Sequence, residues 1–258
     1  MHNNTHNPAQ QSLNKVPEVT AIFWLIKMMS TTVGETAADY LNFNLSFGLT
    51  STSLVVAALL LVTLYYQFRT TRYTPSAYWL AVVFISIFGT LITDNLTDNL
   101  GVPLAVSSGV FSAALMIIFG AWYAREKTLS IHHVDTPSRE GFYWLAVLLT
   151  FALGTAVGDW IAEGWGLGYG HAAILFGIVI GAAAMAHYFF KANAVLCFWI
   201  AYILTRPLGA ALGDLLAQPT VNGGLGLGTT SISLLFLITI TGLVVFLSLG
   251  SKHSDALH

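Results

Sequence analysis

The sequence predicts an all-α, polytopic integral membrane protein whose eight transmembrane helices form four repeats of the same orientation. Of the 258 residues, 55% are apolar and 9% are charged, and the mean hydropathy is +0.71. Soluble domains carry about 25% charged residues, so this composition excludes a soluble globular protein. The net charge of −2 excludes a nucleic-acid partner. Cys197, the single cysteine, lies in an apolar stretch, which excludes a disulfide framework and a cysteine metal site.

Eight apolar stretches are each long enough to cross a bilayer, which takes about 20 residues. In chain order they cover approximately residues 18–41, 49–68, 76–99, 103–124, 141–164, 170–190, 194–217 and 229–250. The polar N-terminal tail, 1–16, lacks the apolar core and the cleavage site of a signal peptide, so we expect the protein to keep it. Residues 17–250 then form a single transmembrane domain, and residues 251–258 form a C-terminal tail.

The basic residues predict the orientation of these spans. Eight of the ten lie in the two tails and in the second, fourth and sixth loops, whereas the remaining loops contain none. Because Lys and Arg accumulate on the cytoplasmic side, both termini should be cytoplasmic. The odd-numbered helices then run outward through a bacterial inner membrane, and the lipid bilayer is the first expected partner.

The chain repeats one sequence pattern. Tyr78 begins the segment YWLAVVFISIFGTLITDNLTDNLG, and Tyr143 begins YWLAVLLTFALGTAVGDWIAEGWGLG. The segment from Phe198 fits the same template, and the segment from Phe23 fits it more loosely. The four helical-hairpin repeats cover about 17–68, 76–124, 141–190 and 194–250. Since the copies share one orientation, we expect pseudo-symmetry about the membrane normal, as in parallel-repeat transporters.

This pattern resembles a known family. Four tandem two-helix repeats, each with a Trp and a GT-x-x-GD-like segment, are similar to the bacterial membrane-anchored proteins classified as a tandem repeat of unknown function. The resemblance covers about residues 18–250 and implies a polytopic bacterial membrane protein built of four hairpins, but it implies no substrate. Two residues depart from the pattern: Trp24 lies one turn closer to the acid, and Gln218 replaces an acid.

Seven of the twelve acidic residues belong to the repeats. Aligned on the first acid, one position holds Glu35, Asp94, Asp159 and Asp214, and the position four residues later holds Asp39, Asp98, Glu163 and Gln218. One turn before the first acid lie Thr31, Thr90 and Thr155. Residues four apart share a helix face, so each odd helix presents an oxygen-rich stripe. A buried acid costs about 2.5–3.5 kcal/mol in a membrane, so its repetition predicts a functional cluster.

Converging carboxylate and hydroxyl oxygens suit hard cations such as Mg²⁺, Mn²⁺ or Ca²⁺, or protons. We therefore expect the four first acids, Glu35, Asp94, Asp159 and Asp214, to be the metal ligands, with the threonines completing the ion-binding site. No resident cofactor is expected, although a divalent cation could be bound or transported. Binding and simple helix-end placement remain equal alternatives for the second acids, which lie closest to water.

Four further residues within the spans are titratable. Lys27 and Arg206 occupy equivalent positions two turns before the first acid, and we expect each to pair with a carboxylate. Such a pair is either structural or a charge switch that competes with a bound cation. His171 and His187 on the sixth span are either hydrogen-bonded packing residues or parts of a proton relay.

These features favour a membrane transporter for a hard cation, with proton coupling as an additional hypothesis. The alternatives are a membrane sensor or scaffold with a structural acid cluster, a passive channel, and an organic-cation transporter using the tryptophans as cation–π surfaces. Nothing resembles a nucleophile elbow, a phosphate loop or a zinc-protease motif, so we do not expect an enzyme. Eight helices can enclose a site within one chain, so a monomer would suffice.

Overall fold

The computed structural model describes residues 14–44 and 48–255, and within these ranges the chain is helical, without strands. The eight long helices are α2 (Ala21–Asp39), α3 (Leu49–Arg69), α4 (Pro75–Asp94), α5 (Leu104–Glu126), α6 (Pro137–Asp159), α7 (Tyr169–Phe190), α8 (Ala194–Ala217) and α9 (Thr229–Asp255). They occupy the predicted spans, and the all-α class is confirmed. Residues 1–13 of the predicted N-terminal tail lie outside the described residues, and α9 extends into the predicted C-terminal tail.

Local sequence signals set several helix starts. The side chains of Thr20, Thr136 and Asn193 each accept a hydrogen bond from a backbone N–H in the first turn of α2, α6 and α8, respectively. Pro75 and Pro137 stand at the first positions of α4 and α6. The first turn of a helix has unpaired N–H groups, so a capping oxygen or a residue without an N–H stabilises the start.

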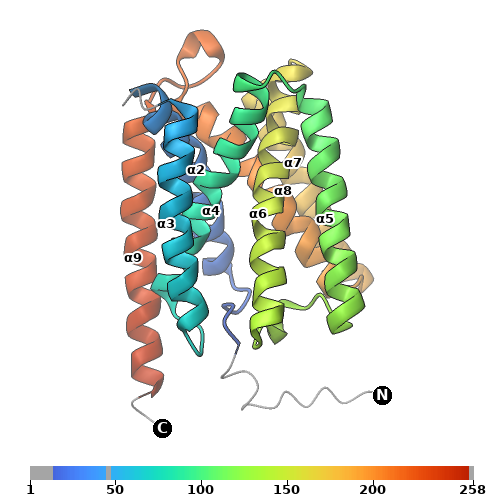
Figure 1. Cartoon of the computed structure of the whole chain (residues 1–258). Helices are drawn as coiled ribbons and strands as arrows, with labels where there is room; N and C mark the ends of the chain where they lie inside the picture. The colour runs from blue at the N-terminus through green and yellow to red at the C-terminus, as the bar shows by residue number, and fades with distance from the viewer. Residues whose placement is uncertain (1–13, 45–47, 256–258) are drawn as a thin grey trace.

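The long helices run alongside one another in one bundle (Figure 1), and their contacts divide them into an inner and an outer set. The inner helices α2, α4, α6 and α8 pack in a closed ring, each against the next and α8 against α2. The outer helices α3, α5, α7 and α9 cover this ring. At least half of the most apolar stretch of α4, α6 and α8 is buried, against less than a quarter for the outer helices. The inner helices therefore hold the core.

Each outer helix packs mainly on the inner helix of the following repeat. Thus α3 packs on α4, α5 on α6, α7 on α8, and α9 returns to α2. The expectation of four helical hairpins is corrected in this respect, because the two helices of one repeat make few contacts with each other. The reason is that the connection at the end of each inner helix carries the chain across to the neighbouring repeat. The repeats consequently interlock.

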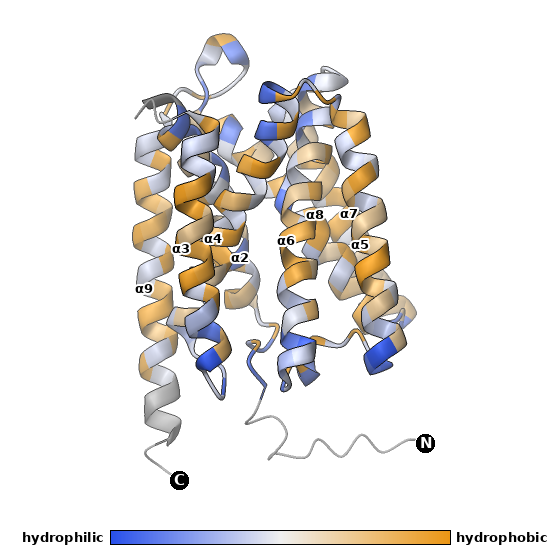
Figure 2. Ribbon diagram, in the orientation of Figure 1, coloured by the Kyte–Doolittle hydropathy of each residue, from blue (hydrophilic) through white to orange (hydrophobic). Residues whose placement is uncertain are grey.

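Seven of the described helices are long and apolar enough to cross a membrane by length and composition. The remaining long helix, α2, is less apolar because it contains Lys27, Glu35 and Asp39. The outer helices consist largely of hydrophobic residues (Figure 2). Large apolar side chains on them are at least 65% exposed, such as Leu61, Met116, Ile178 and Ile238. This apolar exterior is the surface that a bilayer would cover.

Candidate ion-binding axis of the helix ring

A π-helical turn follows three of the four inner helices and defines the register of the repeats. These turns are η1 (Tyr40–Asn44), η2 (Asn95–Asn99) and η4 (Trp160–Gly164). Each begins directly after an aspartate, namely Asp39, Asp94 or Asp159. The equivalent residue of α8 is Asp214, fifteen residues after Trp199, just as Asp39 is fifteen residues after Trp24. Single π turns interrupt α-helices frequently at functional sites.

The predicted alignment of the first repeat is therefore wrong by one turn. Asp39, not Glu35, is equivalent to Asp94, Asp159 and Asp214. Glu35 is instead equivalent to Thr90 and Thr155. The error arose because two acids lie four residues apart on α2, and the wrong one was matched. In the corrected register Trp24 is no longer displaced.

The four equivalent aspartates lie near the ends of the inner helices, at the end of the bundle opposite to that where α2 begins; we call this the aspartate end. Asp214 is buried, whereas Asp39, Asp94 and Asp159 are half-buried. Asp94, Asp159 and Asp214 all lie within electrostatic range of Glu35. Gln218 Nε2 donates a hydrogen bond to Asp39 Oδ2 at 3.3 Å. Carboxylates from all four repeats thus gather around one axis, and we call Asp39, Asp94, Asp159 and Asp214 the aspartate ring.

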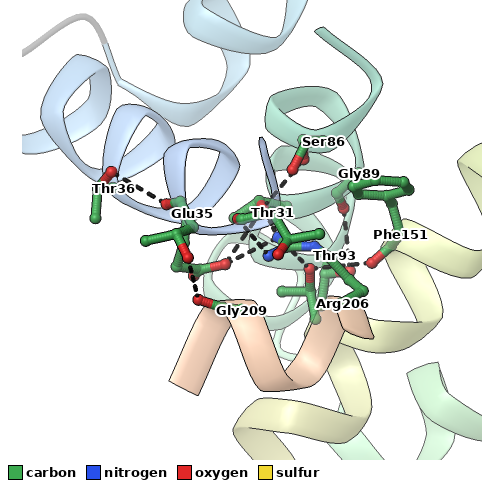
Figure 3. A network of polar contacts seen from close by, with 12 residues as sticks. Thr31, Glu35, Thr36, Ser86, Gly89, Thr93, Phe151, Arg206 and Gly209 are labelled. Atoms are coloured by element: carbon green, nitrogen blue, oxygen red, sulfur yellow. Dashed lines mark hydrogen bonds and ion pairs between the residues drawn. The ribbon is translucent and has the colours of Figure 1, made fainter. Parts of the chain in front are cut away.

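One turn below the aspartate ring, the guanidinium of Arg206 lies at the centre of a polar network (Figure 3). Arg206 is fully buried, and its Nη2 lies 2.9 Å from Glu35 Oε2 in an ion pair. The same Nη2 donates to Thr155 Oγ1 at 2.9 Å and to Thr90 Oγ1. Its Nη1 donates to the carbonyl of Thr31 at 3.0 Å. One side chain of α8 therefore contacts all three of the other inner helices.

The corrected register explains why these groups meet. Glu35, Thr90 and Thr155 are equivalent residues of the first three repeats, and the fourth repeat has Ala210 at this position. The small Ala210 leaves the centre of the layer to Arg206, which comes from one turn below. The predicted pairing of Arg206 with a carboxylate is confirmed, and Thr90 and Thr155 contact the same guanidinium. Thr31 lies one turn lower, contributes its carbonyl, and donates its own hydroxyl to Met28 O at 2.6 Å.

Glycines bring the inner helices into close contact around the ring. A Cβ added to Gly34 would meet Ser86, one at Gly89 would meet Phe151, one at Gly154 would meet Arg206, and one at Gly209 would meet Thr31. Each glycine contacts a residue of the next repeat, and the glycine of the fourth repeat contacts a residue of the first. The four residues contacted are themselves equivalent, each three positions before the glycine of its own repeat. The packing that positions Arg206 is therefore a repeated contact.

The partners of the Lys27 side chain differ from those predicted. Its side chain is fully buried, but among the described residues no carboxylate lies within ion-pair distance of Nζ. Instead, Nζ donates to Thr205 Oγ1 at 2.7 Å and lies 4.1 Å from the ring centre of Tyr202. The expected carboxylate pair is wrong because Glu35 points to Arg206, one turn further along the axis. Hydroxyl and aromatic groups stabilise Lys27 in its place.

The other predicted site residues lie at the edges of this arrangement. Asp98 and Glu163 are exposed in the π turns, and Glu163 Oε1 accepts a hydrogen bond from the Tyr169 hydroxyl at 3.1 Å. His171 and His187 lie on the outer helix α7, where each ring contacts a nearby backbone carbonyl. Their role as a relay stays a prediction. Among the described residues, no three His, Cys, Asp or Glu side chains are close enough together to hold a metal ion.

Sequence reasoning missed a second buried ion pair, at the end of the bundle where α2 begins and α9 ends; we call this the terminus end. Lys15 Nζ lies 2.6 Å from Glu140 Oε2, and both side chains are buried. The predicted spans place Glu140 in the loop before the fifth span and Lys15 in the N-terminal tail. The available signal was Trp144, one turn after Glu140, because it shows that this acid already lies on an apolar helix.

Comparison with known families agrees with the corrected register. A family model described as Repeat of Unknown Function (DUF347) matches residues 22–73, 77–128, 142–193 and 197–252. The chain belongs to the DUF347 repeat family. The DUF347 matches begin at intervals equal to those between Trp24, Trp79, Trp144 and Trp199, as the π turns require. No curated protein and no solved structure matches the chain.

Proposed function

We propose that the protein is a membrane transporter for a hard cation, and that the aspartate ring is its binding site. The observation that carries the proposal is the ring itself: four repeats place an aspartate at the same position around one axis. Three of these aspartates are half-buried, so a cation could reach them from the aspartate end. Carboxylate oxygens are the preferred ligands of Mg²⁺, Mn²⁺ and Ca²⁺.

Electrostatics supports cation binding at this position. Apart from Arg139 and Glu140 in the first turn of α6, the inner helices and their π turns carry the seven acids of the repeats and two basic side chains, Lys27 and Arg206. Arg206 is already paired with Glu35, so it offsets only part of the repulsion among the carboxylates of the aspartate ring. A bound cation would offset this repulsion, which is strong where water is scarce. Below the ring, the Arg206 network closes the axis.

The placement in the membrane belongs to the same proposal. All eight long helices would span the bacterial inner membrane, since α2 packs against α4, α8 and α9 and so needs less apolar exterior than the outer helices. The cyclic glycine contacts support pseudo-fourfold symmetry about the membrane normal. The excess of Lys and Arg near the terminus end supports a cytoplasmic location for both termini, with the aspartate ring facing outward.

A thermal-shift screen of the detergent-purified protein against Mg²⁺, Mn²⁺, Ca²⁺, Zn²⁺ and choline tests binding. We expect a selective rise of Tm with a divalent cation, and we expect Asp159→Asn to abolish it. Glu18→Gln is the matched control, because it makes the same chemical change at an exposed residue near the other end. Equal shifts in wild type and Asp159→Asn would refute the ring as the site.

A structural scaffold is the second candidate, favoured by the absence of a preassembled metal cluster among the described residues. Under this hypothesis the acids and Arg206 hold the repeats together. No cation would then shift Tm selectively, and neutral variants of the ring would change stability alone. The same screen therefore separates the two candidates.

A further inference from the structure

The buried Lys15–Glu140 pair has the composition of a cation site. Glu140 stands in the first turn of α6 and is only 1% exposed. The ammonium of Lys15 contacts Glu140 Oε2 at 2.6 Å and the carbonyl of Phe68, in the last turn of α3, at 3.2 Å. The other carboxylate oxygen, Oε1, accepts from Gln67 Nε2 at 3.2 Å and from Trp144 Nε1 at 3.4 Å. We call Glu140, Gln67 and the Phe68 carbonyl the inner cage.

One acceptor of the inner cage has no hydrogen-bond donor. Gln67 is fully buried, and its Nε2 binds Glu140, but its Oε1 has no partner in the structure. A buried carbonyl oxygen without a donor costs about 1–3 kcal/mol, so such atoms are rare outside sites that accept a ligand or water. The cage thus offers carboxylate, carbonyl and amide oxygens, which are the usual ligands of hard cations.

The cation now in the cage belongs to a segment outside the repeats. Lys15 precedes the first family match, which begins at residue 22. The segment Asn14–Val16 is tied to two loops: Lys15 N donates to Val134 O, Tyr73 N donates to Asn14 O, and Val134 N donates to Asn14 Oδ1, each at 3.1 Å. We call this segment the strap. Val16 is buried in the hydrophobic core and anchors the strap, which itself makes none of the contacts between inner helices.

The inner cage adjoins the aromatic layer that closes the axis at the terminus end. Trp144, which donates to Glu140, packs against Tyr78 with ring centres 5.4 Å apart. The hydroxyls of Tyr78 and Tyr143 are 2.5 Å apart, joining the second and third repeats. Burial raises the pKa of the Tyr73 hydroxyl to about 12, and the hydrogen bond with Trp79 lowers this pKa by a smaller amount. Its hydroxyl therefore stays protonated beside this layer.

We propose that the inner cage is a second cation site, and that Lys15 is a tethered ammonium that occupies it and keeps it closed. The inference rests on the proposed function, because the cage lies at the terminus end of the bundle, opposite to the aspartate ring. A cation leaving or entering at this end would bind Glu140 only after Lys15 had withdrawn. The strap thus acts as a gate whose closed form the structure shows.

The test separates the inner cage from the aspartate ring. In a background of Asp94→Asn and Asp159→Asn, thermal shifts with MnCl₂ and MgCl₂ are measured at constant ionic strength, with choline chloride as the reference. We expect Lys15→Met to gain a Tm rise of several degrees with a divalent cation, and we expect adding Glu140→Gln to remove the gain. The matched control is Arg139→Met, which breaks a half-buried Arg139–Glu126 pair of 2.8 Å at the same end.

Two results would overturn the inner site. One is that Lys15→Met gains no cation response, and the other is that the gain persists in Lys15→Met/Glu140→Gln. If Lys15→Met does not yield folded protein, Val16→Ser loosens the strap while leaving both charges in place, and it should produce a smaller gain. Failure of the proposed function is a separate result, seen when cations fail to stabilise the protein with an intact aspartate ring.

Discussion

The two buried ion pairs of this protein resemble each other in geometry but differ in how they are attached. Arg206 and Glu35 are 2.9 Å apart, and Lys15 and Glu140 are 2.6 Å apart. The first pair joins two inner helices, and its guanidinium also contacts the other two. The second pair joins the strap to the starts and ends of helices. The Arg206–Glu35 pair is therefore part of the ring of inner helices. The Lys15–Glu140 pair attaches a segment outside the repeats, and under the proposal above it opens while the helix ring stays intact.

The largest expected effect on stability comes from breaking the Arg206–Glu35 pair inside the ring of inner helices. Arg206→Met leaves buried Glu35 with one long hydrogen bond among the described residues, from Thr90 at 3.4 Å. Leaving one charge of a buried pair unpaired costs about 3–5 kcal/mol, so Tm and the yield of monodisperse protein should fall sharply. The double variant Arg206→Met/Glu35→Gln should recover most of this loss. Equal stability of the single and double variants would contradict the central role of the pair.

The glycine contacts that position Arg206 give the next effect. At Gly209 an added Cβ would lie 2.7 Å from Thr31 Cβ and 3.2 Å from Met28 O, so Gly209→Ala must separate α8 from α2. We expect a loss of about 1–3 kcal/mol in apparent unfolding free energy. Gly120 of the outer helix α5 is the control, because a Cβ there meets nothing. Gly120→Ala should be neutral or slightly stabilising, and a loss equal to that of Gly209→Ala would refute the close-packed ring.

A smaller effect is expected at the strap. Lys15→Met removes the ammonium, but Gln67 and Trp144 still donate to Glu140, so the cost should be about 1–3 kcal/mol. The half-buried pair of Arg139 and Glu126, which is more accessible to water than the Lys15–Glu140 pair, should contribute about 1 kcal/mol, measured with Arg139→Met. Both values come from thermal or chemical unfolding in one detergent. If Lys15→Met lowered the free energy of unfolding as much as Arg206→Met, the strap would be as important to stability as the Arg206 network, which would contradict this comparison.

Much of this arrangement could be predicted from the sequence. Hydropathy located the eight long helices, and helical spacing identified Thr90, Thr155 and Arg206, which the structure brings together. These features depend on local periodicity, which the sequence displays directly. The pairing of Arg206 with a carboxylate followed from the cost of leaving its charge unpaired in an apolar bundle, and the structure identifies the partner as Glu35.

The remaining features depend on contacts that local patterns do not contain. Glu35 and Asp39 carry the same chemistry one turn apart, so either could be matched to Asp94 by chemistry alone. The π turn after Asp39 and the spacing from Trp24 show that Asp39 is the equivalent residue. The environment of Lys27 depends on Tyr202 and Thr205, almost two hundred residues away. The strap was missed because a polar segment before the first span has no periodicity that would indicate burial.

The central claim is that the aspartate ring binds the transported cation, and divalent metal flux into proteoliposomes tests it most directly. The measurement compares wild type with Asp94→Asn and Asp159→Asn, and with Glu18→Gln as the control. We predict that each ring variant loses most of the flux of the wild type and of Glu18→Gln, while all four proteins reconstitute equally. Unchanged metal flux in both ring variants would contradict the account.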